Sequence, residues 1–164
     1  MVRVAVGIGS NLDRERNISA AVTALRNRFG SLLCSPVYES AAYGFPGPPF
    51  FNLVIVFHSS LGIEMLYKEI RAIEYLQGRG IGKERGGSRS LDIDLLLYGQ
   101  SVSYSKGIDI PRREILDHSY ILKPLADVLP MVNHPTSNET FSDMWTELSP
   151  SLEQLILIED IQFN

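Results

Sequence analysis

The sequence contains few of the residues on which several common classes of protein depend. Its single cysteine, Cys34, excludes an internal disulfide and a cysteine-based zinc site. Its 15 lysine and arginine residues are outnumbered by 19 aspartate and glutamate residues, and the net charge of −4 disfavours a protein that coats nucleic acid. No apolar run is close to the length of about 20 residues that a membrane-spanning helix needs. We therefore expect a cytoplasmic protein with neither membrane nor nucleic-acid partners.

Several familiar nucleotide-binding and catalytic patterns are also missing. Gly7-x-Gly9 follows a strand but lacks the third glycine of a dinucleotide fingerprint. Neither a phosphate-binding Gly-x-x-x-x-Gly-Lys-Ser/Thr loop nor a Gly-x-Ser-x-Gly nucleophile elbow occurs. The three histidines, His58, His118 and His134, show no metal-ligand spacing, so we expect them to be structural or solvated. Any phosphate site must come from other residues.

The rest of the composition, with 45% hydrophobic and 21% charged residues, is that of an ordinary globular protein. We expect one domain over residues 1–164. Hydrophobic periodicity predicts four strands and two helices in the order βαββαβ. They cover residues 2–8 (strand), 13–29 (helix), 32–38 (strand), 51–58 (strand), 62–76 (helix) and 89–98 (strand). This order predicts a ferredoxin-like α+β core, with an antiparallel sheet and both helices packed on one face.

Segments outside that core are predicted less regularly. Residues 40–49 contain three prolines and two glycines, which excludes regular structure and predicts a mobile loop. Pro36 interrupts the strand over residues 32–38 and favours a place at the sheet edge. A C-terminal extension is predicted to hold one short strand between residues 100 and 108, helices over 120–129 and 141–148, and a strand over 155–158.

The last core strand carries an unusual pair of charges. Four apolar residues alternate onto one of its faces: Leu91, Ile93, Leu95 and Leu97. The other face begins with Asp92 and Asp94 and becomes apolar only at Leu96 and Tyr98. At strand rise the two aspartate Cα atoms lie roughly 6.5–7 Å apart, pointing the same way. Two like charges so close, at the end of an apolar segment, require a cation.

A glycine-rich loop with four basic residues, over residues 77–89, precedes this strand. Aspartate oxygens without histidine or cysteine suit Mg²⁺, and two carboxylates on one strand can hold two ions. The basic residues, with Arg112 and Arg113 from later in the chain, can bind phosphates. The combination predicts phosphoryl or nucleotidyl transfer through positioning and charge neutralisation. Without the loop, Asp-x-Asp would be read as an exposed strand end.

Other readings of the residues stay open. A different two-metal phosphotransferase, such as a nucleotidyltransferase, has the same ligand chemistry and is distinguished by its products from ATP. A non-catalytic RNA-binding module of ferredoxin-like fold would need a basic sheet face with exposed aromatic residues. The pI of about 5.4 and the aspartate pair argue against that module. The last alternative is a non-catalytic scaffold protein of this fold, which would not bind Mg–ATP.

Residues 89–99, Arg-Ser-Leu-Asp-Ile-Asp-Leu-Leu-Leu-Tyr-Gly, closely resemble the signature of the 6-hydroxymethyl-7,8-dihydropterin pyrophosphokinases. Other family segments occur in the family's order. They are Gly-Ser-Asn-Leu at 9–12, Phe-Phe-Asn at 50–52, Glu-x-x-Gln-Gly-Arg at 74–79 and Pro-Arg at 111–112. The resemblance covers residues 2–130. It implies ATP-dependent transfer of a pyrophosphoryl group to the hydroxymethyl group of the pterin, with release of AMP, in folate biosynthesis.

The resemblance also implies roles for individual residues. Asp92 and Asp94 would hold two Mg²⁺ ions, and Arg79 and Arg89 would stabilise the migrating pyrophosphate. The pterin site would comprise Ser40, Ala42, Tyr43, Phe50, Asn52 and Tyr120, with Phe50 and Tyr120 stacking on the heterocycle. ATP would contact Glu74, Arg79, Arg85, Arg89 and Leu95. The family's mobile loops would correspond to residues 41–49 and 78–88.

This chain departs from the family's commonest pattern at several positions, and one departure is an exchange within the tyrosine/phenylalanine stacking pair, with Phe50 first and Tyr120 second. Gly86 stands where some members have tryptophan, and Arg112 stands where histidine is frequent. Arg112 keeps a cation near the ATP phosphates but does not titrate near neutral pH. These departures affect the expected nucleotide affinity, not the expected reaction. We expect a monomer whose partners are small-molecule substrates.

Overall fold

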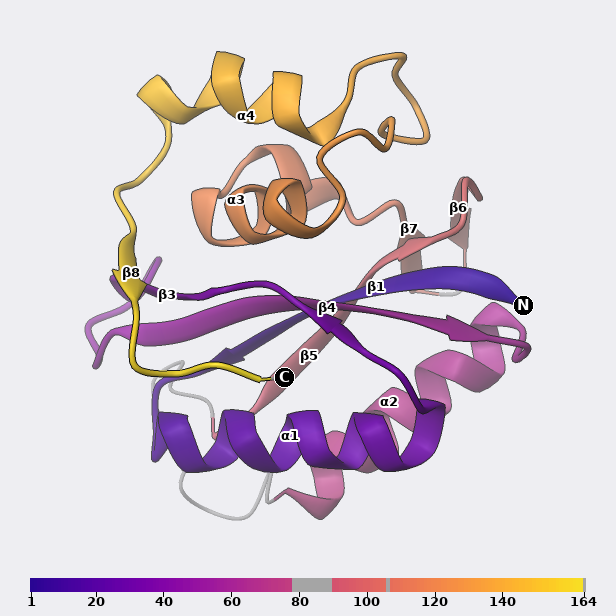
Figure 1. Cartoon of the computed structure of the whole chain (residues 1–164), viewed down its shortest axis with the longest axis horizontal. Helices are drawn as coiled ribbons and strands as arrows, with labels where there is room; N and C mark the ends of the chain where they lie inside the picture. Colours follow the sequence, from indigo (N-terminus) through magenta and orange to yellow (C-terminus); the bar gives the residue numbers. More distant parts are fainter. Residues whose placement is uncertain (78–89, 106, 164) are drawn as a thin grey trace.

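The computed structural model describes residues 1–77, 90–105 and 107–163 (Figure 1). Its main sheet has six strands, in the order β5-β1-β4-β3-β8, and β2 pairs with β4. These strands are β1 (Val2–Ser10), β2 (Leu33–Cys34), β3 (Val37–Ser40), β4 (Phe50–Ser59), β5 (Asp92–Tyr98) and β8 (Ile156–Ile158). All their pairings are antiparallel. The order β5-β1-β4-β3 is that of a ferredoxin-like core, so the predicted fold class is confirmed.

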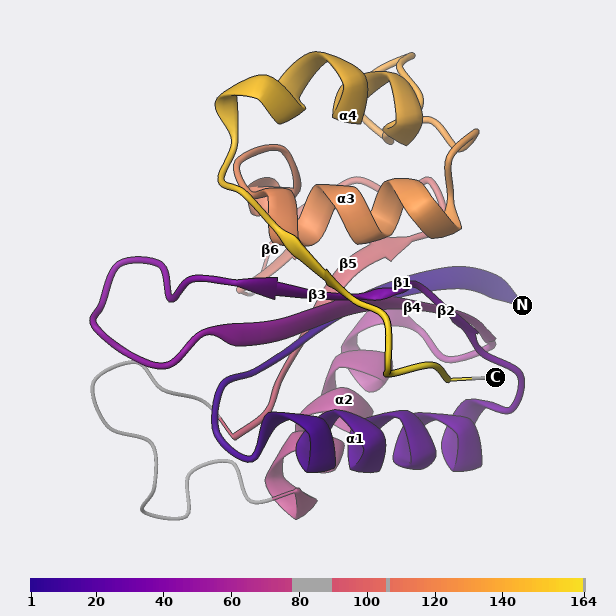
Figure 2. The same cartoon turned by 60° about the vertical axis from the view of Figure 1, so that its left-hand side comes forward.

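Helices cover both faces of this sheet (Figures 1 and 2). Helices α1 (Arg14–Phe29) and α2 (Ile63–Leu76) pack on one face, as predicted. Helix α3 (Ser119–Val128) packs on the other, and α4 (Phe141–Leu148) lies over α3. Successive β1 residues point to opposite faces, so Val4 lies in the α1/α2 core and Ala5 in the α3/α4 core. The sheet is therefore buried on both sides, which explains why β4 is apolar on both faces.

The predicted strand over residues 32–38 is two short strands, because Pro36 has no amide hydrogen to donate. Ser35 bridges the gap: its amide donates to the Val54 carbonyl at 2.9 Å, and its hydroxyl accepts from the Val54 amide at 2.9 Å. The predicted edge position is wrong for β3, because β8 pairs with its outer side. The C-terminal extension thus contributes a strand to the main sheet.

The alternation predicted along β5 is wrong at its end. Val6 pairs with Leu95 and Ala5 with Leu97, so Leu96 is an extra residue that forms a β-bulge. Leu97 consequently faces the α3/α4 core beside Leu96, and Tyr98 returns to the α1/α2 side, where its hydroxyl donates to the Leu61 carbonyl at 2.8 Å. The bulge lies after the two aspartates, which keep the shared face that the sequence predicts.

The remaining elements connect the sheet to α3 and to the C-terminus. Strands β6 (Ser103–Ser105) and β7 (Ile108–Ile110) form a separate two-stranded sheet, and the 3-10 helix η1 (Arg113–Leu116) leads to α3. A second 3-10 helix, η2 (Ser149–Ser151), follows α4. Residues 41–49 contain no helix or strand, as their prolines and glycines predict. Among the described residues, none of the helices has the length and apolar character needed to cross a membrane.

Candidate active site

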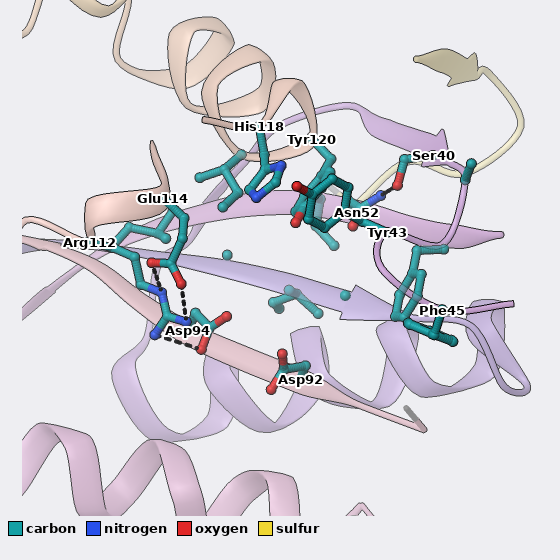
Figure 3. A pocket seen from close by; sticks show the side chains of 18 residues that line it. Ser40, Tyr43, Phe45, Asn52, Asp92, Asp94, Arg112, Glu114, His118 and Tyr120 are labelled. Carbon is teal, nitrogen blue, oxygen red and sulfur yellow. Dashed lines mark hydrogen bonds and ion pairs between the residues drawn. The ribbon is translucent and has the colours of Figure 1, made fainter. Parts of the chain in front are cut away.

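A pocket of about 400 Å³ opens on the α3 side of the sheet (Figure 3). Its floor is formed by β1, β4 and β5, and its walls by residues 41–45, η1 and the start of α3. Acidic side chains lie at one end, and Ser40 and Asn52 lie at the other (Figure 3). The lining residues are Gly7, Ile8, Gly9, Ser40, Ala41, Tyr43, Phe45, Phe50, Asn52, Leu53, Asp92, Asp94, Leu96, Arg112, Glu114, His118, Tyr120 and Ile121.

Two glycines of β1 make room on the floor beside the aspartates. Gly9 pairs with Asp92 and Gly7 with Asp94, so each glycine presents no side chain where a neighbour would otherwise cover a carboxylate. A Cβ atom on Gly9 would lie 3.6 Å from Oδ1 of Asn52, and one on Gly7 would lie 3.4 Å from Leu96. The Gly-x-Gly that fails as a dinucleotide fingerprint therefore opens the pocket floor.

The Asp94 carboxylate lies between two arginines from different elements. Arg112 Nη1 is 3.2 Å from Asp94 Oδ1, and Arg71 Nη2, from α2, is 3.6 Å from the same oxygen. Arg112 Nη2 also donates to Glu114 Oε1 at 3.2 Å. Burial and the neighbouring Asp92 carboxylate raise the pKa of Asp94, and the two arginines oppose this rise only in part. The acidic end therefore favours further positive charge.

Glu74 lies on the opposite side of β5 and does not line the pocket. Its carboxylate is fully buried: Oε1 accepts from the Ile93 amide at 2.6 Å, and Oε2 accepts from Arg71. Arg71 also donates to the Ile93 carbonyl at 3.0 Å. This carboxylate binds the β5 backbone between the two aspartates, and its expected contact with ATP stays a prediction. Its position explains an acid near the C-terminal end of a helix, where the helix dipole disfavours one.

At the other end of the pocket, the Asn52 side chain is held in one orientation. Its Nδ2 donates to the Tyr38 carbonyl at 3.2 Å and to the Ser40 hydroxyl at 2.9 Å. A carbonyl accepts and never donates, so the amide nitrogen must face Tyr38 and Oδ1 is directed beside Gly9. Asn52 and Ser40 are 6% and 4% exposed, so this polar group is fixed within the pocket wall.

Aromatic rings form the walls near Asn52. The His118 ring stacks on Tyr120, with centroids 4.8 Å apart and planes 15° apart. Tyr43 meets His118 edge to face at 4.6 Å, although it is 69% exposed. Phe45 meets Phe50 edge to face at 6.1 Å. Burial, then the nearby carboxylates, raise the pKa of the Tyr120 hydroxyl, which stays protonated at neutral pH.

The structure brings most of the described predicted residues together. Asp92, Asp94 and five of the six predicted pterin residues line the pocket: Ser40, Tyr43, Phe50, Asn52 and Tyr120. Its lining includes Ala41 rather than the predicted Ala42. Leu95 is 3% exposed in the α1/α2 core and does not line this pocket, and its expected contact with ATP stays a prediction. Arg79, Arg85, Arg89 and Gly86 lie outside the described residues.

Four residues that the sequence did not assign to a site belong to this site or support it. Phe45, Glu114 and His118 line the pocket, and Arg71 contacts Asp94 from α2. Arg71 stands three residues before Glu74, a spacing that brings two helical side chains together. His118 was expected to be structural or solvated, because the spacing of the three histidines matches no metal site.

Residues of the acidic end fit a magnesium ion. The described residues contain no group of three or more His, Cys, Asp or Glu side chains that would form an all-protein metal site. Mg²⁺ commonly uses one or two carboxylates and takes its other ligands from water and substrate phosphates. Asp92 and Asp94 supply two such carboxylates on one strand face, within a pocket wide enough for a substrate.

The sequence of this chain is similar to those of known pyrophosphokinases. The model of the family 7,8-dihydro-6-hydroxymethylpterin-pyrophosphokinase matches residues 5–130. A 2-amino-4-hydroxy-6-hydroxymethyldihydropteridine pyrophosphokinase of Aquifex aeolicus is 35% identical over 139 residues, covering 82% of this chain and 85% of its own. The enzyme of the same name from Pseudomonas aeruginosa is 34% identical over 137 residues, which cover 81% of this chain and 84% of that enzyme.

Longer relatives match as well. The folic acid synthesis protein fol1 of Pneumocystis carinii is 30% identical over 98% of this chain, which spans only 23% of that protein. A crystal structure of Plasmodium falciparum HPPK-DHPS superposes with a TM-score of 0.72 over 89% of this chain and 44% of that one. Its sequence identity is 14%, so this likeness concerns the fold alone.

Proposed function

The chain belongs to the 7,8-dihydro-6-hydroxymethylpterin-pyrophosphokinase family, and from that membership we propose how its pocket works. The family and enzyme class expected from the sequence are confirmed: this is a pyrophosphokinase fold and sequence of folate biosynthesis. The proposed reaction transfers the pyrophosphoryl group of ATP to the hydroxymethyl group of 6-hydroxymethyl-7,8-dihydropterin and releases AMP. The whole of residues 1–164 is proposed to act as one domain.

One observation supports this proposal most directly. A carboxylate pair and a site for a flat polar ring occupy opposite ends of the same 400 Å³ pocket (Figure 3). A phosphate donor held by the carboxylates would therefore face an acceptor held between aromatic walls. Holding two reactants in one orientation replaces a bimolecular encounter, and it supplies much of the acceleration in reactions that need no covalent enzyme intermediate.

The ring site suits a pterin. The Asn52 oxygen Oδ1, fixed by the two bonds of Nδ2, would accept from the N–H groups on the edge of the heterocycle. Tyr120 and Phe50 would stack on its faces, and Tyr43 and Phe45 bring further aromatic surface from the loop over residues 41–49. Recognition of N–H groups by a buried acceptor discriminates strongly against rings that lack them.

The acidic end suits Mg–ATP. Asp92 and Asp94 would hold Mg²⁺, which when bound neutralises the phosphates and orients them. Arg112 places a fixed positive charge at this end and is held there by Asp94 and Glu114. The proposed contributions of Arg79, Arg85 and Arg89 to ATP binding and pyrophosphate transfer come from the sequence alone.

Product analysis tests the proposal. The chain is incubated with ATP, Mg²⁺ and 6-hydroxymethyl-7,8-dihydropterin, and the products are separated by ion-exchange chromatography. Stoichiometric AMP and a pyrophosphorylated pterin are expected. Free pyrophosphate would indicate nucleotidyl transfer instead, and absence of any ATP- and pterin-dependent product would refute the function. Location in the cytoplasm and the monomeric state remain predictions from the sequence.

A further inference from the structure

The segment after η2 contacts the start of α3, beside the pocket, and lies outside the family match, which ends at residue 130. Figures 1 and 2 show this segment descending from α4 past α3. Within it, Glu153 contacts Ser119, the first residue of α3. Its Oε1 accepts from the Ser119 amide at 3.1 Å, and its backbone carbonyl accepts from the Ser119 hydroxyl at 2.7 Å. Oε1 also lies 3.5 Å from Nδ1 of His118.

Ser119 is the residue between the two stacked rings of the pocket wall. His118 and Tyr120 flank it, and both line the pocket. The first amides of a helix have no partner within the helix, and the His118 side chain does not cap α3. Glu153 satisfies one of these amides and places a carboxylate where the helix dipole favours one. Ser119 is fully buried, so its amide depends on a protein acceptor, which Glu153 supplies.

The same segment continues into β8, which pairs with β3 on the other side of the ring site. Beyond Glu153 the chain forms β8, in which Ile156 pairs with Glu39 and Leu157 with Tyr38. Ser40, the next residue of β3, accepts the hydrogen bond that orients Asn52. Residues 153–158 therefore connect the start of α3 to β3, the two elements on either side of the ring site.

We propose that Glu153 is a positioning residue for the pterin: it fixes the backbone between His118 and Tyr120 and so sets the stacking wall. This inference rests on the proposed function and deepens it, because it assigns a part of the substrate site to the C-terminal segment. A residue that orients the ring site without touching the phosphates should affect pterin binding far more than ATP binding. It should also leave the chemical step almost unchanged.

Three variants test this role. Glu153→Ala removes the side-chain acceptor, Glu153→Gln keeps an oxygen for the Ser119 amide, and Glu159→Ala alters an exposed glutamate of the same segment as a control. Steady-state AMP formation is measured with pterin and Mg–ATP varied in turn. Pterin affinity is measured separately by calorimetry in the presence of α,β-methylene-ATP. Thermal unfolding of each variant reports on the fold.

For Glu153→Ala we expect the KM and Kd for pterin to rise by about fivefold to tenfold, the equivalent of one lost hydrogen bond. KM for ATP and kcat should stay within about twofold of the wild type. Glu153→Gln should restore pterin affinity to within about twofold, and Glu159→Ala should match the wild type. A Glu153→Ala variant with unchanged pterin affinity, or with KM for both substrates raised equally, would overturn the inference and leave the proposed function intact.

If Glu153→Ala does not fold, Glu153→Asp replaces it, since the shorter side chain keeps the charge but withdraws the oxygen from the Ser119 amide. The same selective rise in pterin KM is expected, and wild-type values would overturn the inference. A wild-type chain that makes no AMP would overturn both the inference and the proposed function, which separates that outcome from the failure of Glu153 alone.

Discussion

Replacing Glu74 by alanine should destabilise the fold more than its place on a helix suggests. The carboxylate is fully buried, accepts from the Ile93 amide at 2.6 Å and pairs with Arg71. It thus joins α2 to the strand that carries both site aspartates. Alanine would leave the amide and the guanidinium without this acceptor.

The size of the effect follows from these contacts. A hydrogen bond that involves a charged group contributes about 1.5–3 kcal/mol, and removing one partner of a buried ion pair costs about 3–5 kcal/mol. Arg71 retains its bond to the Ile93 carbonyl and has 28% of its side chain exposed, so water can solvate part of the released charge. We therefore expect a loss of about 3 kcal/mol in the free energy of unfolding.

Urea unfolding followed by circular dichroism measures this loss. For a chain of this size, about 3 kcal/mol corresponds to a fall in Tm of roughly 6–12 °C. Glu69→Ala is the matched control on the same helix, because Glu69 pairs with Arg28 at the surface at 2.8 Å. No resolvable change is expected for the control, since exposed ion pairs contribute little. A Glu74→Ala variant as stable as the control would refute the role assigned to this carboxylate.

Three further predictions concern the pocket and the pH dependence of stability. Asp92→Asn and Asp94→Asn should each lower AMP formation at least about 100-fold while the circular dichroism spectrum stays that of the wild type, because each removes a charge proposed to hold Mg²⁺. Asn52→Ala should weaken pterin binding at least about tenfold in calorimetry, because the only fixed acceptor assigned to the ring is lost. Burial lowers the pKa of His134 below its ordinary value of about 6.5, so the unfolded chain takes up the proton first. The stability that the neutral ring contributes is present above about pH 6.5 and is lost as the pH falls toward the pKa of His134 in the folded chain. The urea midpoints measured at about pH 8 and about pH 5 should therefore differ less in His134→Gln than in the wild type.

Each of these predictions has its own control and contrary result. For the aspartates, Asp109→Asn alters a partly exposed acid on β7 that pairs with Arg113 outside the pocket, and near-wild-type AMP formation by Asp94→Asn would exclude the proposed metal role. For Asn52, equal weakening of pterin and ATP binding would point to general disruption of the pocket. For His134, an unchanged pH slope in the variant would assign that slope to other groups.

Local patterns predicted much of the fold. The apolar alternation of the central strands and the stripes of the helices depend on residues close in sequence, and the bounds of α4 match their prediction. Errors arose where a distant partner decided the outcome. Pairing with β8 removed β3 from the edge, and pairing of β5 with β1 introduced the bulge at Leu96. A strand's own residues carry no information about the register its neighbour imposes.

The same division holds for the site. Asp92 and Asp94 were identifiable because two charges interrupt an apolar strand, whereas Asn52 was assigned through the family resemblance. Glu74 was assigned through the resemblance as well, but only the structure shows that its carboxylate binds the β5 backbone. Glu153 gave no local signal at all, because its contact with Ser119 joins residues 34 positions apart.

The bulge and the buried Glu74 together explain how two aspartates are held at the end of a strand that is otherwise core. Before Leu96, β5 keeps both carboxylates on the α3 side, and Glu74 binds the amide of the residue between them from the α2 side. Arg71, anchored by Glu74, then reaches Asp94. The sheet therefore carries a buried acid beneath the strand and two partly exposed acids above it, with an arginine shared between the layers. Because the anchoring acid lies out of the pocket, a substrate can displace water around Asp92 and Asp94 without disturbing the contacts that fix the strand.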